Sequence, residues 1–178
     1  MSMTYEQARE LLDKHIERPG PEVELTLIAE ALRVFAEYQF ENFKGLSMKG
    51  SDGPEWTGYE VRLWELGSKF ELYLRANKKI RGRNALSNAI GELVADKRFG
   101  KGREIFVMII GNFGDASFAE VLKPLLADTD VDGHALDALT KLKIRGLDSL
   151  VEPLLAKGKQ TWIRNAAKKY IQKLGKDS

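Results

Sequence analysis

Val121-Leu122-Lys123-Pro124-Leu125-Leu126 recurs 29 positions later as Leu150-Val151-Glu152-Pro153-Leu154-Leu155. The proline occupies the same slot in both copies and the apolar residues keep their register, which a chance match of this length would not do. A turn and a second apolar helix follow each copy, and these second helices are expected over 134–143 and 163–175. A repeat of about 30 residues built from two helices is typical of an α-solenoid, so the sequence predicts an all-α fold.

A third, more degraded copy precedes these two. Ala89-Ile90 and Leu93-Val94 match the paired apolar positions of a first helix, and its second helix is expected over 105–114. An array of about three hairpins would then occupy residues 82–175, in a domain 78–178 that follows an N-terminal helical segment, 1–77. The residues expected to be buried between repeats are Leu125, Leu126, Leu139, Leu142, Leu154, Leu155 and Ile171.

The order of these features resembles HEAT repeats. An apolar helix ends in Pro-Leu-Leu, and an acidic turn follows. The second helix then begins with Ile163-Arg164, followed by Ala166-Ala167. The chain departs from the family at Gly133-His134, where a Val-Arg pair is usual, and at residues 98–102, which replace an acidic turn. The resemblance implies a kink at each proline, and second helices that line a concave, partner-binding surface.

The first 77 residues carry apolar side chains at helical spacing in three stretches. Thr4 is expected to cap a helix that ends before residues 18–21, where two prolines break the pattern. Further helices are expected over 22–43 and 59–76. Between them, residues 45–56 hold three glycines, one proline and Trp56. Such a connection is either pinned onto the body by its apolar side chains or exposed as a partner-contacting loop, with Trp56 as the main contact.

The composition is that of a globular protein, with 43% hydrophobic and 30% charged residues among 178. The chain has no cysteine, which excludes disulfides and thiolate zinc sites and fits a reducing compartment. No apolar run approaches the roughly 20 residues of a membrane span, and the first residues lack the features of a secretory signal. We therefore expect a cytoplasmic protein with no membrane partner.

The net charge of +2 conceals an asymmetry. Residues 1–77 hold 9 Lys and Arg against 14 Asp and Glu, whereas residues 78–178 hold 19 against 12, so the two parts carry −5 and +7. Four of the six residues 78–83 are cationic. The basic half is either an ordinary solvated helical surface or an anion-binding face.

No metal, cofactor or catalytic site is predicted. Asp128, Asp130 and Asp132 match the first half of a calcium-binding loop, but the twelfth position, where a bidentate Glu is needed, is Leu139. The only two histidines, His15 and His134, are far apart in the sequence. We interpret the acidic turn as a cap for the following helix.

Alignment of the three second helices places a set of side chains on one outward face. Met108, Asp137 and Lys169 occupy equivalent positions, and Asn112, Lys141 and Lys173 follow one turn later. The alternative is an ordinary solvated face, which stacked repeats also expose. As a binding face it would be mixed and net basic, with Val107 and Met108 as apolar anchors. The predicted partner-binding residues are Val107, Met108, Asn112, Asp137, Lys141, Lys169, Lys173 and Trp56.

A noncatalytic protein-binding module is the function that these patterns favour, because solenoids build extended binding surfaces and no catalytic constellation is found. An inhibitor or a bacterial toxin-neutralising immunity protein would fit the size, and an acidic partner would fit the charge. The alternative is nucleic-acid binding. Some proteins that resemble HEAT arrays are alkylated-base DNA glycosylases, for which Asp137 and Trp162 are the conceivable counterparts of the groove carboxylate and aromatic residue.

Overall fold

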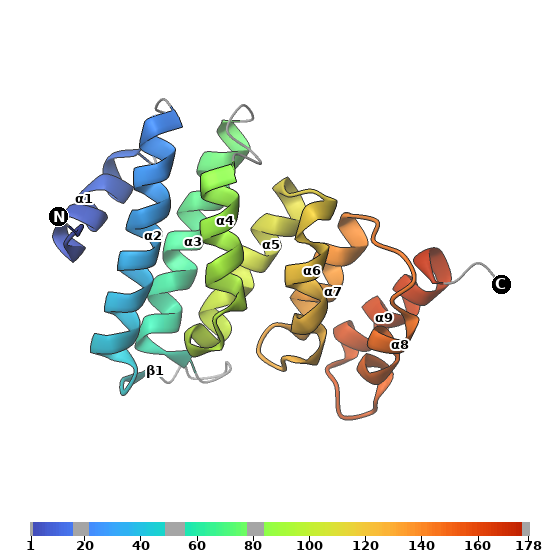
Figure 1. Ribbon diagram of the computed structural model, residues 1–178. Helices are drawn as coiled ribbons and strands as arrows, with labels where there is room; N and C mark the ends of the chain where they lie inside the picture. Colours follow the sequence, from blue (N-terminus) through green and yellow to red (C-terminus); the bar gives the residue numbers. More distant parts are fainter. Residues whose placement is uncertain (1, 16–21, 49–55, 78–83, 176–178) are drawn as a thin grey trace. The chain divides into compact units, whose positions relative to one another are not determined.

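The computed structural model describes residues 2–15, 22–48, 56–77 and 84–175, without the side chains of 22–24, 47–48 and 56–57 (Figure 1). Over these residues the chain is helical apart from one antiparallel ladder, in which β1 (Ser47–Met48) pairs with β2 (Trp56–Thr57). The prediction of an all-α fold is confirmed. No helix of the described ranges is both long and apolar enough to cross a membrane.

The chain forms two compact units, residues 1–106 and 107–178. The boundary expected from the sequence, between 77 and 78, therefore falls inside the first unit, directly before the undescribed residues 78–83. Each unit has its own buried apolar residues, so each is described separately.

The first unit is organised around its longest helix, α2 (Glu22–Phe43), which contacts α1, α3 and α4. Thr4 and Gln7 cap α1 reciprocally: Gln7 N–H donates to Thr4 Oγ1 (3.3 Å) and Thr4 N–H donates to Gln7 Oε1 (2.9 Å). The cap and the helix over 22–43 agree with the sequence prediction. The remaining elements are α1 (Tyr5–His15), α3 (Gly58–Ala76), α4 (Asn84–Ala95) and the 3₁₀ segment η2 (Lys97–Arg103).

η2 contains residues 98–102, where the chain departs from the HEAT pattern. The buried carboxylate of Glu60 on α3 accepts the backbone N–H of Lys101 at 2.7 Å. Arg103, also buried, donates from Nε to the Gly100 carbonyl at 2.8 Å. Arg103 Nη1 also donates to the Val94 carbonyl on α4 at 3.3 Å. The contacts with Glu60 and Val94 fasten η2 to its own unit, so this turn is a packed part of the fold.

In the second unit, two helical segments have the same internal break. α6 (Ala119–Leu122) continues as the 3₁₀ segment η4 (Lys123–Ala127), and α8 (Asp148–Val151) continues as η5 (Glu152–Leu155). The change comes one residue before Pro124 and Pro153, because proline has no N–H to donate to the carbonyl four residues earlier. The short 3₁₀ segment η3 (Ala116–Phe118) precedes α6.

The second helices of the repeat are α5 (Glu104–Phe113), α7 (Asp132–Lys141) and α9 (Thr161–Leu174), of which α5 enters the second unit at Val107. α7 contacts α6, η4 and α9. The residues predicted to be core divide into two groups. Leu125, Leu126, Leu139 and Leu154 are buried, whereas Leu142, Leu155 and Ile171 are half-buried.

Candidate partner-binding face

Solvent reaches α7 along a single stripe. His134, Asp137 and Thr140 are half-buried and Lys141 is exposed, whereas the other six residues of the helix are buried. The stripe follows from the apolar spacing of α7, because α6, η4 and α9 pack on its other sides. Any partner that touches α7 must therefore touch this stripe.

Side chains join α7 to α5 at this surface. Lys141 Nζ donates to Asn112 Oδ1 at 2.9 Å and forms an ion pair with Asp137 at 2.8 Å, one turn earlier on α7. The two helices approach closely, since a Cβ atom on Gly111 would lie 2.8 Å from the Cα atom of Ala138. Met108, half-buried, lies one turn before Asn112 on the same side of α5.

A second junction joins α7 to α9. The rings of His134 and Trp162 lie 5.3 Å apart between centroids. A Cβ atom on Gly133 would overlap the Trp162 ring, so glycine is the residue that fits at this position without a shift of the tryptophan. Asp132, buried at the start of α7, pairs with Lys159 Nζ at 2.5 Å just before α9.

Lys169 and Lys173 extend this surface along α9. They follow Trp162 at seven and eleven residues, a spacing that keeps all three side chains on one side of the helix, and both lysines are exposed. We call the combined surface the second-helix face. Its residues are Met108, Asn112, His134, Asp137, Lys141, Trp162, Lys169 and Lys173.

The structure thus places six of the predicted partner-binding residues on one surface of the second unit. Val107 is a correction: its side chain is 0% exposed, so it belongs to the core and offers no anchor. Its neighbour Met108 faces outward because successive helical residues differ by about 100° in direction. His134 and Trp162 were missed as face residues, although the unusual Gly133-His134 pair was a visible signal.

Trp56 is the predicted contact outside this surface. Its backbone pairs with Met48 in the β ladder, but its side chain lies outside the described residues. The cationic residues 78–83 also lie outside them. The partner-contacting loop therefore stays a prediction.

Burial sets the protonation state of His134, the histidine of the second-helix face. The desolvated surroundings of His134 lower its pKa below the usual value, and the nearby carboxylates of Asp137 and Asp132 act in the opposite direction. The neutral imidazole is therefore the form that the fold favours.

The acidic turn before α7 serves the fold through local contacts. Asp128 Oδ1 accepts the backbone N–H of Asp130 at 3.2 Å, and Asp132 is engaged with Lys159. Within the described ranges, no group of three or more potential metal-ligating side chains comes together. These contacts engage Asp128 and Asp132 within the fold, but α7 begins after Val131 without a side-chain cap, so the expected cap of this helix is not formed.

No family model, curated protein or solved structure matches the chain. The function is therefore argued from the geometry of the second-helix face. The pair considered for a glycosylase-like site, Asp137 and Trp162, lies on neighbouring helices of this face, where the carboxylate of Asp137 forms an ion pair with Lys141.

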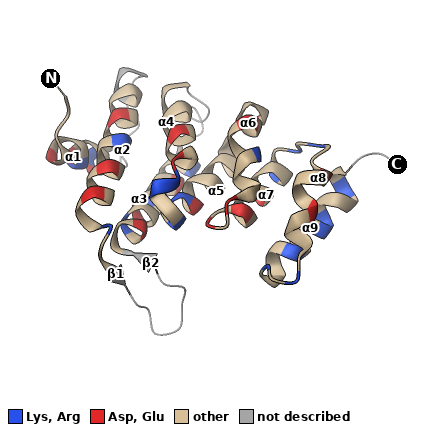
Figure 2. Cartoon of the chain, turned by 60° about the horizontal axis from the view of Figure 1, so that its bottom comes forward, with Lys and Arg blue, Asp and Glu red and all other residues tan. Residues whose placement is uncertain are grey.

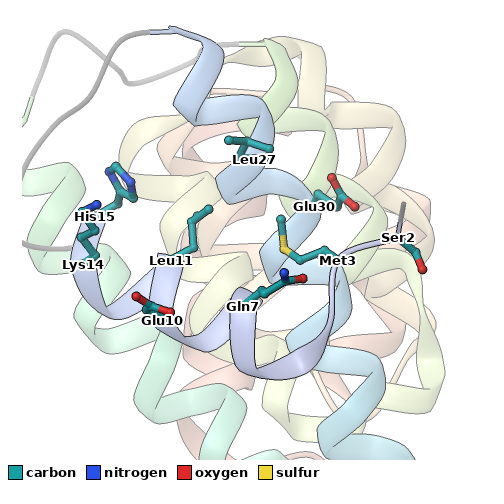
Figure 3. A pocket seen from close by; sticks show the side chains of 9 residues that line it. All are labelled: Ser2, Met3, Gln7, Glu10, Leu11, Lys14, His15, Leu27 and Glu30. Atoms are coloured by element: carbon teal, nitrogen blue, oxygen red, sulfur yellow. The ribbon is translucent and has the colours of Figure 1, made fainter.

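A separate cleft of about 460 Å³ lies between α1 and α2 in the first unit (Figure 3). Met3, Leu11 and Leu27 give it an apolar part, and polar side chains, including Glu10 and Glu30, surround them. None of the residues predicted from the sequence lines this cleft. It is independent of the second-helix face.

Proposed function

We propose that the chain is a noncatalytic protein-binding module of the HEAT-like type, which receives its partner on the second-helix face. One observation carries the proposal: α5, α7 and α9 each present one stripe, and side-chain contacts join the stripes laterally. Lys141 to Asn112 is the first of these contacts and His134 to Trp162 is the second. Continuous surfaces of this kind are what solenoid proteins use for binding.

The chemistry of the face suits a protein partner. It combines an exposed tryptophan, a half-buried methionine, an amide and charged groups of both signs, a mixture typical of protein–protein interfaces. Thr140, the hydroxyl-bearing residue of the α7 stripe, donates its hydroxyl to the Leu136 carbonyl at 2.7 Å within the same helix. A binder of this kind acts by occupying a surface of its partner, as an inhibitor or a toxin-neutralising immunity protein would, and we place it in the cytoplasm.

Affinity capture from a lysate of the source cells tests the proposal. The immobilised full chain is compared with Asn112→Arg and Asp137→Arg, which add bulk and charge in the middle of the face. The matched control is Asn88→Arg, an exposed asparagine on α4. A bound protein should be retained by the wild type and by the control, and depleted about tenfold or more by the face variants.

Circular dichroism must show that each variant is folded. If the same proteins are retained equally by all four chains, the second-helix face is not the binding surface. Capture of nucleic acid in place of protein would support the second candidate function.

Nucleic-acid binding is that second candidate, and the observation that favours it is a set of exposed lysines on α9. Within the described residues, Lys168, Lys169 and Lys173 form no ion pair. If they contact phosphates, each lysine removed should flatten the slope of log K against log salt by about one unit, to a similar extent for every sequence.

A further inference from the structure

The C-terminal part of the chain has a one-sided charge. Residues 153–176 contain seven Lys and Arg and no Asp or Glu, and Figure 2 shows the positions of Lys and Arg in blue along α9. Two of these cations are used within the fold: Lys159 pairs with Asp132, and Arg164 donates to the carbonyls of Lys157 and Lys159 at 2.9 and 2.8 Å. Lys169 and Lys173 remain exposed without an ion pair among the described residues.

Lys141, in contrast, already has an ion-pair partner and a hydrogen-bond partner within the fold. It is held by Asp137 at 2.8 Å and by Asn112 at 2.9 Å. The stripe of α7 is therefore close to neutral, and the available positive charge of the face is concentrated on α9.

Trp162 provides a fixed apolar surface beside these lysines. Its side chain is 44% exposed, whereas tryptophan side chains are on average highly buried in folded proteins. Its Nε1 donates to Gln160 Oε1 at 2.6 Å, and its ring packs on Gly133 and next to His134. A ring that is already held in place loses little conformational entropy on binding, which is the property of an interface hot spot.

The geometry points to an acidic polypeptide segment as the occupant of α9, and this inference rests on the proposed function. An apolar side chain of the segment covers Trp162, and its carboxylates meet Lys169 and Lys173, which lie along the same side of the helix. Opposite charges placed in this way steer association, and the buried tryptophan contact slows dissociation.

Charge distribution favours a polypeptide over a nucleic-acid backbone. A nucleic acid carries a phosphate at every nucleotide and is held by cations spread along its path. On the second-helix face the unpaired cations lie on α9 alone, whereas Lys141 on α7 is paired with Asp137. A segment with a few carboxylates and neighbouring apolar groups matches this pattern better.

Titration of the ¹⁵N-labelled full chain with a random copolymer of glutamate and tyrosine tests the inference. The indole N–H signal of Trp162, assigned with Trp162→Phe, should shift together with the amides of Lys169 and Lys173. The double variant Lys169→Glu/Lys173→Glu should raise the half-saturating concentration about tenfold or more. The matched control is Lys157→Glu/Lys168→Glu, which makes the same charge change at exposed lysines off the Trp162 side, and it should change this value by less than about threefold.

Three results would overturn the inference: an unmoved Trp162 indole signal, equal losses in both double variants, or tighter binding of a twenty-nucleotide oligothymidine than of the copolymer through the same residues. The proposed function is judged separately, because its capture experiment depends on Asn112 and Asp137. If those variants lose the captured protein and the copolymer does not bind α9, the second-helix face stands as the binding surface. The acidic segment is then rejected as its occupant.

Discussion

Tyr170 is a single side chain that fastens the turn between α7 and α8 to α9. Its buried hydroxyl donates to the Ile144 carbonyl at 2.7 Å and accepts the Leu147 N–H at 3.3 Å. Burial raises the pKa of the phenol, so the hydroxyl stays protonated and able to donate.

Tyr170→Phe should lower the free energy of unfolding by about 1–3 kcal/mol, because it leaves buried backbone groups without a partner. Urea denaturation measures the change. Tyr38→Phe is the control, since Tyr38 is partly exposed and its hydroxyl makes no hydrogen bond within the described residues. A loss for Tyr170→Phe no larger than for this control would mean that the hydroxyl contributes nothing to the turn.

His134 makes the stability of the fold depend on pH, and the direction of this dependence follows from the lowered pKa of its imidazole. The unfolded chain binds a proton near pH 6.5. The folded chain resists protonation to a lower pH because the ring is desolvated. The stabilisation is therefore fully present above the unfolded pKa, and it is lost as the pH falls from about 6.5 through the folded pKa.

The free energy of unfolding should accordingly fall between about pH 7 and pH 5, and His134→Gln should reduce this slope. Denaturant titrations at several pH values measure it, and His15→Gln controls for the other histidine. An unchanged slope in His134→Gln, with the slope reduced in His15→Gln, would assign the pH response to α1.

At the scale of elements, the packing of α5 on α7 depends on Gly111. A Cβ atom there would lie 2.8 Å from the Cα atom of Ala138 and 3.0 Å from its Cβ atom, and backbone atoms cannot move aside as a flexible side chain does. Gly111→Ala should therefore destabilise the protein by about 1–3 kcal/mol and separate Asn112 from Lys141.

Thermal denaturation measures the change in stability, and Gly158→Ala is the matched control because no atom lies within 4 Å of its added Cβ. The control should be neutral or slightly stabilising. A neutral result for Gly111→Ala would show that α5 and α7 are not in close contact at this point.

The sequence predicted the elements better than their contacts. Proline and apolar spacing located the repeated first helices, because these signals are local, and Thr4 marked the start of α1 for the same reason. The face was harder to predict. Val107 and Met108 are adjacent and chemically alike, yet only the packing of α5 decides that the first is core. The exposure of Trp162 depends on Gly133, a residue of another helix, and no sequence period reports that contact.

At the scale of the whole molecule, the two compact units have separate buried cores. Leu63 is 0% exposed in the first unit and Leu139 is 0% exposed in the second. Because the buried residues of the two units are separate, a core defect should act most strongly on the unit in which it lies.

Leu139→Ala should therefore lower the free energy of unfolding of the second unit by about 2–5 kcal/mol and leave the first unit changed by less than about 0.5 kcal/mol. Native-state amide hydrogen exchange measures the stability of each unit separately, because the slowest-exchanging amides of a unit report the opening of that unit. Leu63→Ala is the matched control, the same truncation at an equally buried leucine, and it should give the opposite distribution. Equal loss of protection in both units would show that the chain unfolds as one cooperative body, whereas a loss below about half a kcal/mol in both would place Leu139 outside the core and invalidate the repeat register.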